Sequence, residues 1–121
     1  MVRRLNPHLV SRFAFALWVM SVAVVCYLSL IPRVEFPVDF EGADLMYHSL
    51  AYLWLSFLPS FGFQRMKAGL VCALLMVPLG IALEFAQILV PGRLFSLTDM
   101  GANTFGVFLG MVFGRYLSST S

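Results

Sequence analysis

The chain has 121 residues, of which 60% are hydrophobic and only 12% are charged. A soluble domain carries about 25% charged residues, so the composition argues against an ordinary soluble protein and places the chain among membrane proteins. The length allows a single domain, 1–121, and the net charge of +2 does not by itself point to a partner.

The two cysteines, Cys26 and Cys72, both fall inside apolar runs. We expect them to be buried as small hydrophobic side chains, with no disulfide between them and no zinc site, because their spacing matches no zinc motif. No strand-like alternation, internal repeat or low-complexity tract stands out. The predicted fold class is therefore all-α.

Residues 13–31 contain no charge and predict a first membrane-spanning helix, which needs about 20 apolar residues. A cleaved signal peptide is the rival interpretation, but its apolar core would be shorter and a small-x-small cleavage site should follow. Ile-Pro-Arg-Val-Glu follows instead, at 31–35, so we predict an uncleaved helix. The connection 32–43 contains two prolines and a glycine and is predicted to be irregular.

Three more membrane-spanning helices are predicted, over residues 45–63, 68–90 and 97–117. Asp44 stands at the start of the second, where an acid complements the helix dipole. Pro78 lies within the third, and neighbouring helices can accommodate a kink there. The result is a polytopic membrane protein of four transmembrane helices with short connections.

Lys and Arg are distributed unevenly over the connections. The N-terminal tail, the second connection and the C-terminal end hold Arg3, Arg4, Arg12, Arg65, Lys67 and Arg115. Only Arg33 and Arg93 fall on the first and third connections. The positive-inside rule therefore predicts that both termini are cytoplasmic.

This topology brings polar residues from three helices to one depth near the outer face of the membrane. They are Asp44 and His48 on the second helix, Glu84 and Gln87 on the third, and Arg93, Asp99 and Asn103 at the turn and start of the fourth. Tyr52 lies on the same stripe of the second helix as Asp44 and His48. Ionisable residues are costly in a membrane, so a functional site is the default hypothesis. We predict a polar pocket in the outer leaflet.

The fourth helix carries a row of glycines on the face that holds Asp99 and Asn103. These are Gly106, Gly110 and Gly114. Glycines at four-residue spacing let helix backbones approach closely in a membrane. We expect this packing to draw Asp99 and Asn103 into the bundle, and we assign the glycines no chemistry.

Chemical roles follow from the residue types. His48 and Glu84 are candidate general acids or bases, and Asp44, one turn before His48, would orient its imidazole. Arg93 would bind phosphate or carboxylate through its planar guanidinium group. The other predicted ligand-binding residues, which would complete a hydrogen-bonded pocket, are Tyr52, Gln87, Asp99 and Asn103.

Each of these residues also has a structural interpretation. Glu84 could pair with Arg93, because a buried charge must find a partner. Asp99 could serve only its helix start, and Asn103 could join helices. Asp44 and His48, with a further acid, offer metal ligands, but no compact ligand motif is present. We therefore expect no metal and no cofactor.

At these residues the chain resembles the VanZ-like family of small bacterial membrane proteins. The family pattern is Asp-Lys-x-x-His with a nearby Tyr, then Glu-x-x-Gln, Pro-Gly-Arg-x-x-Ser, and Asp-x-x-x-Asn followed by glycines. The matching positions are Asp44, His48 and Tyr52; Glu84 and Gln87; Pro91, Gly92, Arg93 and Ser96; and Asp99, Asn103, Gly106 and Gly110. Leu45 stands where the family often has Lys, which removes a cation from the predicted site.

The resemblance implies a multi-pass protein of the bacterial inner membrane. The founding member is associated with resistance to teicoplanin, a glycopeptide antibiotic that acts on cell-wall precursors, and a housekeeping envelope role is equally consistent with the resemblance. We expect a site for the head group of an envelope lipid or lipid-linked precursor, and the sequence leaves open whether a reaction follows. Membrane lipids are the expected partners, and nucleic acid is not. The alternative is a non-catalytic structural or assembly subunit, as an oligomer or with another membrane protein.

Overall fold

The computed structural model describes residues 7–31, 43–63, 65–90 and 97–120, and within these ranges the chain is helical with no strand. The elements are α1 (Pro7–Leu30), α2 (Ala43–Phe57), the short α3 (Pro59–Gly62), α4 (Met66–Ala86), the 3₁₀ turn η1 (Gln87–Leu89) and α5 (Leu97–Thr120). The prediction of an all-α chain is confirmed for the described residues. α1 begins earlier than the predicted 13–31, and a proline at a first helical position suits such a start.

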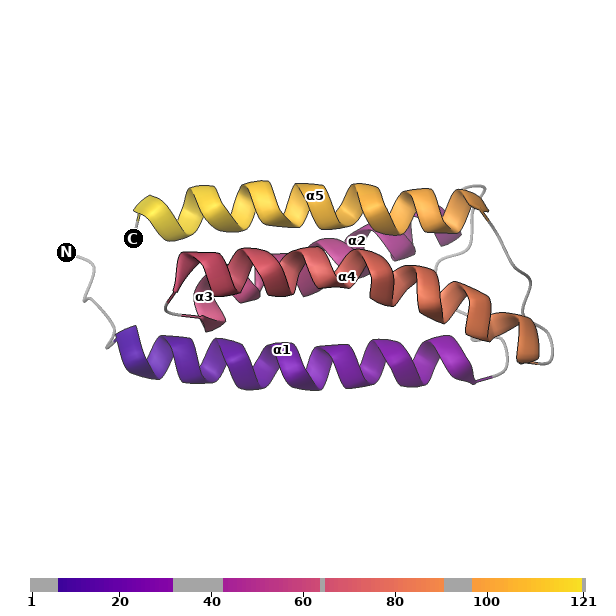
Figure 1. The fold of residues 1–121 in the computed structure, drawn as a ribbon, viewed down its shortest axis with the longest axis horizontal. Coiled ribbons are helices and arrows are strands. Elements are labelled where there is room, and N and C mark those ends of the chain that lie inside the picture. Colours follow the sequence, from indigo (N-terminus) through magenta and orange to yellow (C-terminus); the bar gives the residue numbers. More distant parts are fainter. Residues whose placement is uncertain (1–6, 32–42, 64, 91–96, 121) are drawn as a thin grey trace.

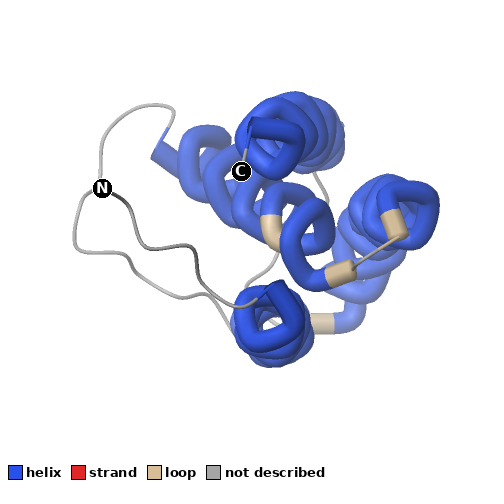
Figure 2. The backbone as a smooth tube through the Cα atoms, turned by 90° about the vertical axis from the view of Figure 1, so that its left-hand side faces the viewer, coloured by secondary structure: helices blue, strands red, loops and turns tan. Residues whose placement is uncertain are grey.

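The four long helices of the described residues run alongside one another and alternate in direction along the chain (Figure 1). Figure 2 shows them nearly end-on, gathered into a bundle rather than a single layer. A buried cluster of Tyr52, Leu55, Met76 and Val107 joins α2, α4 and α5, and Trp18 of α1 packs against it. Burial of these apolar side chains holds the helices together where they meet.

The helix predicted over 45–63 is divided at Pro59, where α2 gives way to α3. Proline has no backbone N–H, so it cannot donate to the carbonyl group four residues earlier. That carbonyl belongs to Leu55, which is fully buried, and its oxygen accepts a 2.9 Å hydrogen bond from the indole Nε1 of Trp18. A side chain of α1 thus satisfies an acceptor that Pro59 leaves unused.

α2 and α5 make the most extensive contact between any two helices. A Cβ atom at Gly106 would overlap the backbone carbonyl oxygen of Ser49, and one at Gly110 would overlap that of Leu53. At Gly114 an added Cβ would lie 2.6 Å from the hydroxyl oxygen of Ser60. The predicted close packing along the glycine row is confirmed, because only glycine lets the two backbones approach this closely.

Two helices are long and apolar enough to cross a membrane, His8–Leu30 and Met66–Leu89, among the residues described. α1, with 24 residues, extends roughly 36 Å at about 1.5 Å per residue, against a hydrocarbon core of about 30 Å. α2 is shorter, with 15 residues, and α5 carries Asp99, Asn103 and Arg115, which lower its mean hydropathy.

Large apolar side chains lie exposed on every long helix, among them Phe13 on α1, Leu50 on α2, Leu75 on α4 and Val112 on α5. Both cysteines, Cys26 and Cys72, are free but only partly buried. The expectation that they are buried is therefore wrong, because their apolar runs face outward over part of the helix surface.

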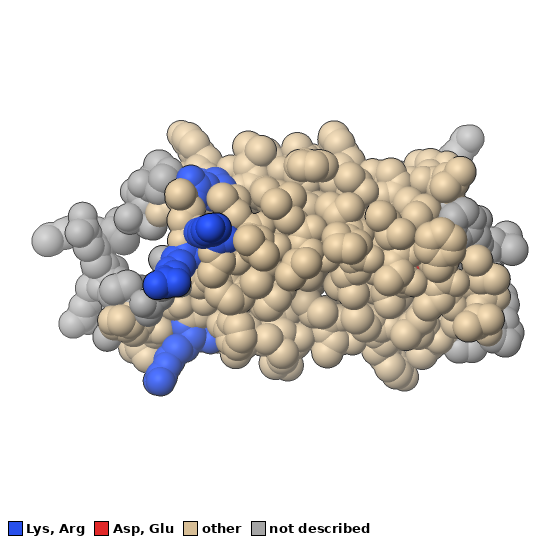
Figure 3. All heavy atoms as spheres, in the orientation of Figure 1, with Lys and Arg blue, Asp and Glu red and all other residues tan. Residues whose placement is uncertain are grey.

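The charged side chains of the described residues separate along the bundle. Those of Lys and Arg are Arg12, Arg65, Lys67 and Arg115, and they lie at the end where α1 begins and α5 ends (Figure 3). We call this the basic end. Glu84, near the end of α4, and Asp99, in the first turn of α5, lie towards the opposite end.

Candidate functional site

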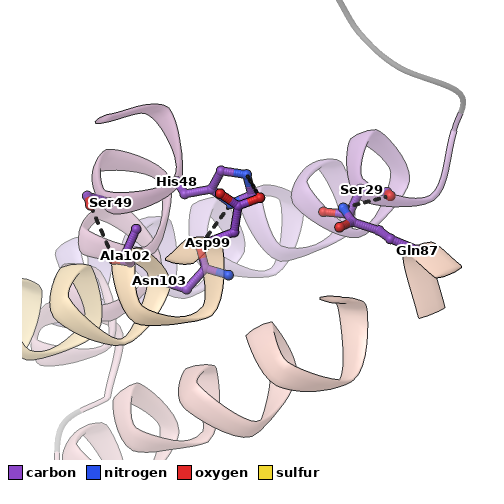
Figure 4. A network of polar contacts seen from close by, with 7 residues as sticks. All are labelled: Ser29, His48, Ser49, Gln87, Asp99, Ala102 and Asn103. Atoms are coloured by element: carbon purple, nitrogen blue, oxygen red, sulfur yellow. Dashed lines mark hydrogen bonds and ion pairs between the residues drawn. The ribbon is translucent and has the colours of Figure 1, made fainter. Parts of the chain in front are cut away.

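His48 of α2 lies between two polar side chains of α5, Asp99 and Asn103 (Figure 4). The imidazole Nδ1 is 3.0 Å from the amide oxygen of Asn103, and Nε2 is 3.6 Å from a carboxylate oxygen of Asp99. We call these three residues the His48 cluster. They are separated by about half the chain and meet only because α2 and α5 pack along each other.

The amide oxygen of Asn103 can only accept a hydrogen bond, so its contact requires a proton on Nδ1 of His48. The other ring nitrogen, Nε2, faces the carboxylate of Asp99. At 3.6 Å this is an ion-pair distance rather than a close hydrogen bond. The side chains of His48 and Asp99 are 26% and 21% exposed, so a ligand can reach both.

The local fold fixes this arrangement through the glycine row. Gly106 places α5 against the backbone of Ser49, the residue after His48. The hydroxyl group of Ser49 also donates a 3.2 Å hydrogen bond to the carbonyl oxygen of Ala102. Because Asn103 follows Ala102, this register brings the Asn103 amide opposite the imidazole.

Asn103 also belongs to a more deeply buried layer that continues from the His48 cluster to Tyr52 and Glu84. Gly80 of α4 faces the ring of Tyr52 and the amide of Asn103, and an added Cβ would lie 3.1 Å and 3.3 Å from them. Tyr52, Glu84 and Asn103 are only 3%, 1% and 4% exposed. Among the described residues, every buried polar side-chain atom has a hydrogen-bond partner. Three helices thus enclose a satisfied polar interior.

Gln87, predicted to bind ligand, uses its amide nitrogen to join two helices. Nε2 donates a 3.1 Å hydrogen bond to the backbone carbonyl of Ser29, near the end of α1 (Figure 4). Figure 4 shows this pair apart from the His48 cluster. The observed contact favours the structural interpretation of this residue.

Two predicted site residues cannot be placed from the structure. Arg93 lies outside the described residues, as do Pro91, Gly92 and Ser96. The side chain of Asp44 also lies outside them, although its backbone is in the first turn of α2. Asp99 and Asn103 are the partners found at the two ring nitrogens of His48. The predicted orienting role of Asp44 stays a prediction.

Sequence reasoning overlooked Ser49 and Ser29. Ser49 could have been found as the hydroxyl residue next to His48 that faces a glycine, whereas the Ser29 carbonyl group has no sequence signal. In the part of the chain that the structure covers, no three side chains of His, Cys, Asp and Glu come together in a way that could hold a metal ion.

Comparison with known protein families, characterised proteins and solved structures finds no match to this chain. The resemblance to the VanZ-like family therefore depends on the sequence motifs alone.

Proposed function

We propose that the chain is a multi-pass membrane protein of the bacterial inner membrane whose His48 cluster binds the head group of an envelope lipid or lipid-linked cell-wall precursor in the outer leaflet. The observation that carries the proposal is a partly accessible imidazole, with a carboxylate at one nitrogen and an amide oxygen at the other. A histidine that served packing alone would not need to be accessible or to lie beside an acid.

The surface of the bundle supports the membrane part of this proposal. Exposed apolar side chains cover all four long helices, whereas soluble monomers rarely expose apolar patches larger than a few hundred Å². The cluster lies towards the end opposite the basic end, which the positive-inside rule assigns to the outer face.

The chemistry of the cluster indicates what the head group must offer. The carboxylate of Asp99 accepts hydrogen bonds, so hydroxyl, amide or ammonium groups are suitable ligands. Arg93 is the expected phosphate-binding residue. Glu84 and Tyr52 lie in the buried layer next to the cluster. They would hold the site in place rather than touch the ligand directly.

The test is native mass spectrometry of the full-length protein extracted from bacterial membranes. We expect the wild type to retain a phosphate-bearing lipid that His48→Ala and Arg93→Ala lose, while Thr104→Ala keeps it. Thr104 is the matched control because it follows Asn103 but its hydroxyl group donates a 3.0 Å hydrogen bond to the carbonyl oxygen of Met100 in its own helix. Identical lipids on all variants would end the proposal.

A second candidate function is a structural or assembly subunit without a ligand. It is favoured by the complete pairing of the buried polar side chains within the described residues and by the Gln87 bond to α1. His48→Gln separates the two, since glutamine can hydrogen-bond Asn103 but lacks the second ring nitrogen that faces Asp99. If His48→Ala and His48→Gln change only the amount of folded protein, the structural function is the correct one.

A further inference from the structure

A second polar site lies at the basic end, far from the His48 cluster along the bundle. It is a pocket of about 270 Å³ between α3, the start of α4 and the end of α5. Two arginines line it, Arg65 just before α4 and Arg115 near the end of α5, together with the hydroxyl residues Ser60 and Ser118. Apolar side chains, including Leu70, form the rest of the wall.

The charge of this pocket is unbalanced. None of the described residues that line it is acidic, and the carboxylates of Glu84 and Asp99 lie towards the opposite end. Two arginines in one pocket repel each other, and an anion between them would remove that repulsion. Arginine also presents paired N–H donors that match the oxygens of a phosphate group.

We propose that this pocket binds the phosphate head group of an anionic glycerophospholipid in the cytoplasmic leaflet. Ligand pockets that enclose a whole drug-sized molecule have about 300–1,000 Å³, so this smaller pocket suits a head group with its acyl chains outside. Met66, which lines the pocket, is also 60% exposed and apolar, and it would contact those chains.

The location agrees with this ligand. Basic pockets between helices at the cytoplasmic side of a membrane are recognised sites for anionic lipid head groups. The inference depends on the membrane placement proposed above, but it does not depend on the His48 cluster. His48→Ala should therefore leave binding at the basic end unchanged, and a failure at one site does not imply failure at the other.

The test measures lipid binding to the full-length protein in detergent by native mass spectrometry, with phosphatidylglycerol and phosphatidylcholine as probes. We expect the wild type to prefer phosphatidylglycerol and Arg65→Gln/Arg115→Gln to lose at least about tenfold in its binding, because both charged donors of the pocket are removed. The matched control is Arg12→Gln/Lys67→Gln, which removes the same charge from the same end but spares the pocket. This control should bind within about twofold of the wild type.

Several results would overturn the inference. Equal losses in the two double variants would show general surface attraction, and no loss in either would show that the pocket is not used. Displacement of phosphatidylglycerol by an equal concentration of inorganic phosphate would assign the pocket to free phosphate. If Arg65→Gln/Arg115→Gln does not fold, Arg65→Lys/Arg115→Lys replaces it in the test, because it keeps the charge and removes the paired donors. Wild-type binding by this lysine variant would also contradict the proposal.

Discussion

At the scale of single residues, the indole N–H of Trp18 pairs with the Leu55 carbonyl group that Pro59 leaves without a backbone donor. Trp18→Phe removes the indole N–H and leaves a buried carbonyl group unpaired, which costs about 1–3 kcal/mol. Pro59→Ala supplies a backbone N–H that can reach the same carbonyl group. We therefore expect Trp18→Phe to be less destabilising when Pro59→Ala is also present.

A double-mutant cycle measures this coupling, using unfolding in detergent followed by circular dichroism. The packing that is lost when Phe replaces Trp18 is the same with Pro59 and with Ala at that position, so it cancels in the cycle. An equal cost of Trp18→Phe with Pro59 and with Ala at that position would show that the indole N–H is not what satisfies Leu55.

The sequence predicted that His48, Asp99 and Asn103 would lie in one region, because helix boundaries and charge placement require only counting along the chain. It did not predict their pairing. Asp44, one turn from His48, was the expected partner, whereas Asp99 and Asn103 of α5 lie at the ring nitrogens. Which face of α2 meets α5 depends on three-dimensional packing, and no pattern within one helix contains that information.

At the scale of helices, the glycine row determines how closely α2 and α5 approach. Gly106→Ala would place a Cβ atom against the carbonyl group of Ser49, and such overpacking costs about 1–3 kcal/mol. Gly101→Ala is the matched control in the same helix, since nothing lies within 4 Å of an added Cβ there. Alanine favours a helix over glycine by about 1 kcal/mol, so Gly101→Ala should stabilise the protein slightly.

The unfolding midpoints of the two variants in detergent test this prediction, and they should shift in opposite directions. Similar shifts would show that α2 and α5 are not in close contact at Gly106. This row was predictable because four-residue spacing is a local pattern. The division of the second predicted helix at Pro59 was missed, since the apolar run continues through it.

At the scale of the whole molecule, α2, α4 and α5 are joined into one bundle, so the proposed membrane placement applies to them together. Only α1 and α4 have the length and hydropathy of membrane spans in the described residues. However, α2 packs along α5, and the core cluster joins both to α4. Composition identified the apolar helices, whereas the proposed placement of the more polar α5 in the membrane depends on the helices against which it packs.

The orientation can be tested with single cysteines in a chain that lacks Cys26 and Cys72. Lys67→Cys lies at the basic end, and Leu89→Cys lies beyond α4 at a position that is 87% exposed. The positive-inside rule predicts that a membrane-impermeant maleimide labels Leu89→Cys in spheroplasts and Lys67→Cys only after the membrane is opened. Labelling in the reverse order would place the His48 cluster in the cytoplasmic leaflet, and recovery of the protein in the soluble fraction would remove the membrane placement on which both lipid sites depend.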